Sequence, residues 1–209
     1  MRLEPQQHAA RVGRRSASPV GSAAGALVFA QERPQIYTGI GSRETPVEIL
    51  QLMARIGYTL AQNGWILRSG HAPGADQAFE HGARQAKGKM EIYLPWNGFE
   101  NAYTGNRQPE YIVGFHPDAE RVASLHHPAW ERCSQGARKL HTRNVFQVAG
   151  LDLETFSDMV ICWTKDGKRG GGTGQTLRIA EHLQIPIFDL AVIANPEVIL
   201  EFINYGVVP

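Results

Sequence analysis

Three short glycine-rich loops are the segments of this chain best suited to do chemistry. They span residues 39–43, 70–75 and 170–174, and each follows a run of residues typical of a β-strand. Glycine lets the backbone approach a ligand closely, and a helix that begins after such a loop offers unpaired N–H groups and a positive dipole end. The chemistry that these loops predict is therefore the binding of a phosphate group.

The third loop is the strongest of the three, because four glycines and Thr173 stand directly before a predicted helix. No loop matches the dinucleotide fingerprint or the Walker pattern, so each one taken alone is more typical of a tight turn, and it is the three together that favour a phosphate site. The loop residues predicted to bind phosphate or ligand are Gly39, Gly41, Ser42, Arg43, Gly70, His71, Gly74, Ala75, Gly171, Gly172, Thr173, Gly174 and Gln175.

Two carboxylates beside the second loop are candidate catalytic groups. Asp76 either caps the helix that follows or acts on a ligand, by bonding to a ribose hydroxyl or by activating a water. Glu80 lies one turn later on the same helix face. The pair would be placed for acid–base work on a glycosidic bond, while a solvated helix face is the alternative for Glu80.

Aromatic residues and histidines complete the set of candidate groups. Trp96, Phe99 and Tyr103 either stack on a base or pack within their own loop. Trp96 and Asp76 are the predicted base or sugar contacts. No metal is expected, because no recognised metal spacing joins His116, His126, His127 and His141. A nucleotide-type ligand is expected, and no cofactor is required besides it.

Alternating strands and helices must position these residues. Strands are predicted at 36–41, 65–69, 91–95, 159–163 and 185–189, with helices between them. Thr45-Pro46-Val47-Glu48 has the form of a capping box, with Thr45 as N-cap and Glu48 reaching back to it. The alternation predicts an α/β, Rossmann-like open sheet, mostly parallel, of about five or more strands with helices on both faces. In such sheets ligands bind at the carboxyl ends of the strands, where the three loops would converge.

Two parts of the chain differ in composition. Residues 1–33 are predicted to be a basic extension rich in Ala, Gly and Ser, and residues 34–209 one domain with an insertion at about 96–130. Residues 1–30 carry a net charge of +3 and the whole chain +1, so the remainder carries −2. Such a body is a poor general nucleic-acid binder.

Hydropathy and cysteine content indicate a globular protein of a reducing compartment. Hydrophobic residues make up 43% of the chain, and no apolar run is long enough for a membrane span. Cys133 and Cys162 are too few for a disulfide framework, and Cys162 lies in an apolar run that predicts a buried thiol. A cytoplasmic location is expected.

The motifs also resemble a known superfamily. Segments 37–43, 69–76 and 171–174 resemble the SLOG superfamily, and residues 143–151 look like the arginine–asparagine and Ala-Gly-Leu segment of DNA-processing protein A. The whole is most similar to the DprA-like proteins of phages and bacteria, over roughly 35–190. This resemblance implies the same Rossmann-like fold and adds Ser69 and Asn144 as ligand contacts. It also supports Arg143, whose chemistry and neighbours Lys139 and His141 already suggest an anion contact.

One departure from the superfamily bears on activity. Its phosphoribohydrolases carry Pro-Gly-Gly-x-Gly-Thr-x-x-Glu, in which the glutamate helps cleave the glycosidic bond. Alignment on residues 171–174 places Gly170 at the proline, Gln175 at the threonine and Arg178 at the glutamate. A cation cannot act as that carboxylate. Glu181, three residues further on roughly the same helix face, is the candidate substitute.

The favoured function is therefore the binding, as sensing or sequestration, of a nucleotide-derived and phosphate-bearing small molecule such as an ADP-ribose-type ligand. The first alternative is an N-glycosidic hydrolase or transferase that uses Asp76, Glu80 or Glu181. The second is a DprA-like recombination mediator that binds single-stranded DNA. Whether the chain is an enzyme stays open. A small molecule is the expected partner, without a membrane, and these folds often pair, so a dimer or higher oligomer is expected.

Overall fold

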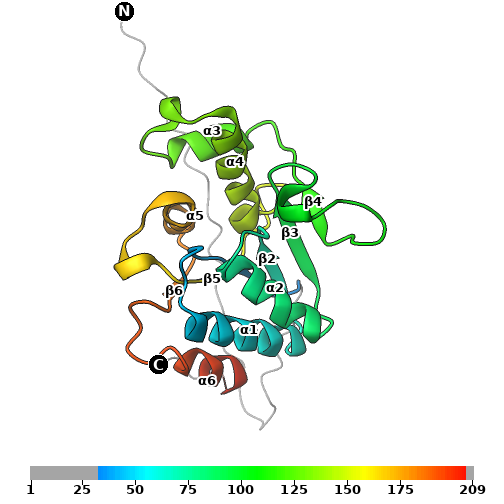
Figure 1. The fold of residues 1–209 in the computed structure, drawn as a ribbon, viewed down its shortest axis with the longest axis vertical. Helices are drawn as coiled ribbons and strands as arrows, with labels where there is room; N and C mark the ends of the chain where they lie inside the picture. The colour runs from blue at the N-terminus through cyan, green and yellow to red at the C-terminus, as the bar shows by residue number, and fades with distance from the viewer. Residues whose placement is uncertain (1–32, 206–209) are drawn as a thin grey trace, which may run out of the picture. The chain divides into compact units, whose positions relative to one another are not determined.

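The computed structural model describes residues 33–205. The expected extension over residues 1–33 lies outside the described residues except for Arg33. The described strands form one six-stranded sheet in the order β4-β3-β2-β1-β5-β6, and every neighbouring pair is parallel (Figure 1). The strands are β1 Ile36–Gly39, β2 Ile66–Ser69, β3 Met90–Leu94, β4 Tyr111–Val113, β5 Met159–Cys162 and β6 Ile187–Asp189. The predicted Rossmann-like α/β architecture is confirmed.

Helices cover both faces of the sheet. On one face α1 (Val47–Gln62), α2 (Ala75–Gln85) and α6 (Val198–Tyr205) enclose a core that includes Tyr37, Met53 and Phe79. On the other face α3 (Ala119–Leu125), α4 (Gln135–Ala149) and α5 (Gly171–His182) pack around Val160 and Leu177. The central strands β1 and β5 are buried along their whole length, as parallel strands covered on both faces must be.

Three short 3₁₀ helices lie in the connections, η1 (Phe99–Asn101), η2 (Trp130–Arg132) and η3 (Lys165–Gly167). Among the described residues, no helix is both long and apolar enough to cross a membrane.

The predicted insertion at 96–130 contains regular structure. β4 pairs with β3 in parallel, with Tyr111 opposite Ile92, and α3 follows it. The predicted helix over 128–148 is divided, because η2 precedes α4 and Ser134 caps α4 by accepting a hydrogen bond from the Ala137 N–H at 3.2 Å. The segment therefore extends the sheet by one strand instead of only covering the site.

The predicted cap at Thr45 is wrong, and of the two alternatives for Asp76 the structure does not show the cap. The Thr45 hydroxyl donates to the Ser42 carbonyl at 2.7 Å, closing the turn after β1, and Pro46 occupies the N-cap of α1. At α2 the N-cap is Gly74, with φ of +90°, and Asp76 is the second helical residue. Its side chain is buried.

The order of strands reverses at β1. From β1 the chain moves outward to β2, β3 and β4, and then returns to the other side of β1 with β5 and β6. The loops after β1 and β5 consequently turn to opposite faces of the sheet. They open a crevice between them, which is where ligands bind in open α/β sheets.

Candidate functional site

A cavity of about 750 Å³ lies at this reversal point. We call it the glycine-loop cavity. It is lined by the loop after β1, the loop after β5, the start of α5 and one side of α4. Nine of the predicted ligand residues line it, namely Gly41, Ser42, Arg43, Asp76, Arg143, Asn144, Gly171, Gly172 and Thr173. The first and third glycine-rich loops, which are far apart in the sequence, thus meet in one cavity.

Arg143 is the most unusual residue of this cavity. Its side chain extends from α4 and is only 6% exposed, and its Nε and Nη1 atoms find no hydrogen-bond partner among the described residues. Nη1 lies 3.7 Å from the Asp76 carboxylate, and the guanidinium carbon lies 5.8 Å from the centre of the Phe99 ring. Burial lowers the pKa of Arg143, although the Asp76 charge opposes this shift. A buried cation with free donors is costly unless an anion completes its bonds.

The second glycine-rich loop makes room for this arginine. A Cβ atom on Gly70 would lie 1.2 Å from Arg143 Nη1, so only glycine is compatible with the observed guanidinium position. Gly70 and its neighbours Ser69, His71, Gly74 and Ala75 do not line the cavity. The Ser69 hydroxyl donates to the Gly39 carbonyl at 2.6 Å, and Gly39 itself packs against Phe79. The structure thus gives most of this loop a positioning role.

Of the three candidate catalytic carboxylates, Asp76 is the one that lines the cavity, together with Glu44 and Asp166. It is 4% exposed and lies against the backbone N–H groups of Gly41, Gly70 and Ala72. Burial raises the pKa of Asp76 to about 6, although Arg143 and these N–H groups oppose the shift. A carboxyl group with such a pKa can donate or accept a proton close to neutral pH.

Glu80 is engaged elsewhere. It is buried in α2, where one oxygen accepts from His71 at 2.6 Å and the other from Tyr111 at 2.7 Å and from Arg84 at 2.8 Å. Burial alone would raise the pKa of Glu80, but these hydrogen bonds outweigh it and the pKa is lowered. Glu80 does not line the cavity, so it does not face the cavity together with Asp76 as the predicted acid–base pair would.

Glu181 also lies away from the cavity lining. It is exposed near the end of α5 and forms an ion pair with Arg169. Arg178, which stands at the position of the phosphoribohydrolase glutamate, donates through Nε to the His126 carbonyl at 2.8 Å. Both side chains stabilise the surroundings of α5.

The start of α5 is held by polar side chains of α4. Asn144 Nδ2 donates to the Gly172 carbonyl at 3.3 Å and to Gln175 Oε1 at 3.0 Å. Gln175 is fully buried and its Nε2 donates to the Ala123 carbonyl at 3.0 Å. A Cβ on Gly174 would lie 2.0 Å from the Arg169 carbonyl oxygen, so glycine is required there. Gln175 and Gly174 therefore shape the loop, while residues 171–173 face the cavity.

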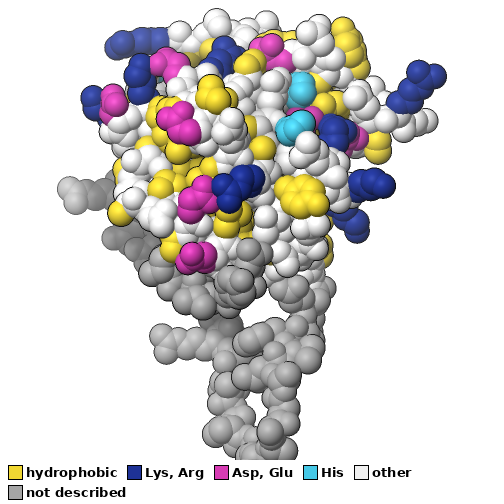
Figure 2. Space-filling view, turned by 60° about the horizontal axis from the view of Figure 1, so that its bottom comes forward, with side chains coloured by type: hydrophobic (Ala, Val, Ile, Leu, Met, Phe, Trp, Pro, Cys, Tyr) yellow, Lys and Arg dark blue, Asp and Glu magenta, His cyan; other side chains and the backbone are white. Residues whose placement is uncertain are grey.

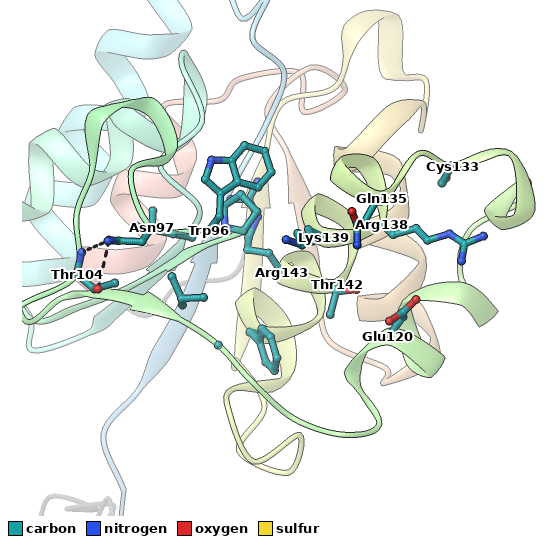
Figure 3. Close-up of a pocket in the computed structure, with 15 residues that line it drawn as sticks. Trp96, Asn97, Thr104, Glu120, Cys133, Gln135, Arg138, Lys139, Thr142 and Arg143 are labelled. Atoms are coloured by element: carbon teal, nitrogen blue, oxygen red, sulfur yellow. Dashed lines mark hydrogen bonds between the residues drawn. The ribbon is translucent and has the colours of Figure 1, made fainter.

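A second cavity, of about 820 Å³, adjoins the first and shares Arg143 with it (Figure 3). We call it the Trp96 cavity. Trp96, 38% exposed, packs edge-on against Phe99, and Arg138 and Lys139 project from α4 on the opposite side. Of the two predicted base or sugar contacts, Trp96 lines this cavity and Asp76 lines the glycine-loop cavity.

Several residues that line the candidate site were not predicted from the sequence. Thr164 and Lys165 after β5 line the glycine-loop cavity, and Lys165 Nζ pairs with Glu44 at 2.5 Å. No local motif marks them, because the structure positions the loop after β5 through Asp189 of β6, which accepts from Thr164. His127 and His141, from which no metal site was expected, come together with Cys133.

The sheet order and the cavity at its reversal point define a Rossmann-like α/β protein. No family model matches the sequence, and a comparison with curated proteins finds no similar one. Among solved structures, DNA processing protein A from Helicobacter pylori is 23% identical with a TM-score of 0.49, and the match covers 83% of this chain and 73% of that one. The Moco carrier protein from Chlamydomonas reinhardtii is 17% identical with a TM-score of 0.46, covering 83% and 86%.

DNA processing protein A from Streptococcus pneumoniae is 16% identical with a TM-score of 0.45, covering 83% of this chain and 56% of that one. At these low identities the likeness concerns the fold, and the roles of residues follow from the geometry of this chain alone.

Proposed function

We propose that this chain binds a phosphate-bearing, nucleotide-type small molecule in the glycine-loop cavity. The observation that carries the proposal is the buried Arg143 guanidinium, whose Nε and Nη1 have no hydrogen-bond partner within residues 33–205. A phosphate oxygen would complete these donors in a charge-assisted hydrogen bond. The positive end of α5, which begins at Gly171 in the same cavity, favours the same ligand charge.

The adjoining cavity suggests where the rest of the ligand would lie. Arg143 lines both cavities, so a phosphate held there would leave the sugar or base free to extend toward Trp96. An exposed indole edge and the cations of α4 suit an aromatic base attached to phosphate groups. An ADP-ribose-type ligand has both parts.

Calorimetric titration tests this proposal. ADP-ribose, mononucleotides and inorganic phosphate are titrated into the full chain and into the Arg143→Gln variant. The lost charge-assisted bonds are expected to weaken nucleotide binding about tenfold to hundredfold. Arg121→Gln is the matched control, because Arg121 is an exposed helical arginine of α3 that lines neither cavity. Equal affinity of both variants for the ligand, or no binding of any nucleotide by the native chain, would contradict the proposal.

The raised pKa of Asp76 favours a second candidate function, cleavage of an N-glycosidic bond. Its carboxyl group lines the cavity and changes charge near pH 6, as a general acid or base must. Mass spectrometry after incubation with nucleotides and NAD distinguishes the two functions. Turnover that is lost in Asp76→Asn while binding persists would support an enzyme. If the nucleotides stay intact in a saturated complex, the chain binds them without cleaving them.

Self-association and a cytoplasmic location stay predictions from the sequence.

A further inference from the structure

Two histidines and a cysteine meet beside the glycine-loop cavity. His127 follows α3, Cys133 follows η2, and His141 lies on α4. Cys133 Sγ is 3.7 Å from His127 Nδ1 and 3.8 Å from its Nε2, and the two imidazole centroids are 4.3 Å apart. One ligand atom from each residue lies within 4.8 Å of the others, and all three residues are half-buried. We propose that His127, Cys133 and His141 bind a Zn²⁺ ion.

The distances fit this ion. Zinc bonds of about 2.3 Å to sulfur and about 2.1 Å to nitrogen place sulfur and nitrogen roughly 3.6 Å apart in a tetrahedron. The observed separations between Cys133 Sγ and the His127 nitrogens differ from this value by only about 0.1–0.2 Å. Because Sγ is almost equidistant from the two ring nitrogens, neither lone pair points at it, and the His127 imidazole would rotate so that one nitrogen shares the metal with the sulfur.

A hydrogen-bond network orients His141 for such a role. Its Nδ1 lies 2.8 Å from Gln175 Oε1. The amide of Gln175 has a defined orientation, because its Nε2 donates to the Ala123 carbonyl and its Oε1 also accepts from Asn144. Nδ1 of His141 must then carry the proton, which leaves the Nε2 lone pair for a metal. Metal-binding histidines typically have such a partner on their other nitrogen.

His127 also offers a lone pair near the sulfur. Its Nδ1 accepts a hydrogen bond from the Ala129 N–H at 3.2 Å, so this nitrogen is unprotonated. Zn²⁺ would take the place of that weak donor. Imidazole and thiolate together are ligands that zinc prefers, and three protein ligands leave a fourth position for water or another small ligand.

The site would link three parts of the structure. The ion would tie the segment between α3 and α4 to α4 itself, and Gln175 would extend the connection to the first turns of α5. Cys133 lines the Trp96 cavity and His141 lines the glycine-loop cavity, so the ion would lie between the two. This inference stands on its own ligands and does not depend on the proposed nucleotide.

Metal analysis of the purified full chain tests the site. The reduced protein is loaded with Zn²⁺, desalted and analysed by plasma mass spectrometry, and about one zinc per chain is expected. Cys133→Ser and His141→Gln should each lose most of the metal. His81→Gln is the control, because His81 is an exposed histidine of α2 outside the cluster, and it should retain the metal. A native chain without zinc, or Cys133→Ser with undiminished zinc, would overturn the proposal.

Cobalt replacement gives a second readout that needs no variant. Co²⁺ bound to the native chain should show the thiolate-to-metal charge-transfer absorption of a cysteine ligand and the intense visible bands of tetrahedral coordination. A spectrum with only weak octahedral bands would contradict the site. This measurement decides the matter even if the Cys133→Ser variant does not fold.

Discussion

Arg143 and Asp76 form an incompletely matched buried pair on one wall of the glycine-loop cavity. The two groups lie 3.7 Å apart, and each is less than a tenth exposed. Asp76 is also surrounded by backbone N–H groups, whereas two nitrogens of Arg143 have no hydrogen-bond partner in the described part of the chain. Under the proposed function, a ligand anion would accept hydrogen bonds from the unpaired Arg143 donors.

The raised pKa of Asp76 predicts that stability depends on pH. The pKa is about 6 in the folded chain against 3.8 for an ordinary aspartate, so between these values the folded chain binds a proton that the unfolded chain does not. The contribution of Asp76 to the free energy of unfolding should therefore fall as pH rises from about 4 to about 6, by roughly 3 kcal/mol.

Urea unfolding of the native chain and of Asp76→Asn between pH about 4 and about 7 measures this effect. Because asparagine does not titrate, the stability of the variant relative to the native chain should increase across the window. Other titrating groups cancel in the comparison. A difference in stability that stays constant with pH would show that Asp76 has an ordinary pKa.

Gly70→Ala tests whether the second loop acts through Arg143. The added methyl group would occupy the position of Arg143 Nη1, so the guanidinium must move. We expect a loss of stability of about 1–3 kcal/mol and at least tenfold weaker nucleotide binding. Gly136→Ala in the first turn of α4 is the control, because a Cβ there meets nothing within 4 Å. If Gly70→Ala binds the nucleotide as tightly as the native chain, the position of Arg143 does not affect ligand binding.

Among the elements, α5 requires a glycine in its first turn. Gly174 allows the first turn to pack on the Arg169 carbonyl, and Asn144 of α4 holds the turn from the other side. The loop after β5 and the start of the helix thereby form one rigid wall of the cavity.

Gly174→Ala should therefore disturb that wall, whereas Gly170→Ala should not. The alanine Cβ at 174 would lie 2.0 Å from a backbone oxygen, which cannot move without displacing the loop, while a Cβ at 170 meets nothing within 4 Å. We expect the melting temperature to fall for Gly174→Ala by the several degrees that correspond to about 1–3 kcal/mol, and to change little for Gly170→Ala. Equal melting temperatures for the two variants would contradict this account of α5.

For the whole molecule, the charge distribution bears on the DNA-binding alternative. The surface shown in Figure 2 carries Lys or Arg and Asp or Glu side chains interspersed over its described residues. The chain beyond residue 30 has a net charge of −2, because the first 30 residues carry +3 of the total of +1. Without an excess of cations, little counterion release is available to drive binding to a nucleic-acid backbone.

We accordingly expect no shift of single-stranded DNA by the full chain in gels at moderate salt. A chain that lacks residues 1–30 is the companion sample, because it separates the basic segment from the rest. A shift by both samples would favour the recombination-mediator function. A shift by the full chain alone would assign DNA binding to the first 30 residues.

Local sequence patterns predicted most of the elements and two of the loops that line the candidate site. Apolar spacing marked α1 and the strands, and glycines at strand ends marked the loops. These signals are local, because backbone conformation and hydrophobic periodicity act over a few residues. They are less informative at 96–130, where the three-residue β4 is too short for a periodic pattern and is stabilised by its pairing with β3.

Only the tertiary structure decided which loop residues face the cavity and which support it. Gly70 leaves room for the Arg143 side chain, and Gly174 leaves room for a backbone carbonyl group. The Glu80 carboxylate accepts hydrogen bonds from His71, Arg84 and Tyr111. A further cluster is formed by His127, Cys133 and His141. Each of these roles depends on contacts between segments distant in the chain or on the path of an irregular turn. Such contacts arise from packing, and no spacing of residue types encodes them.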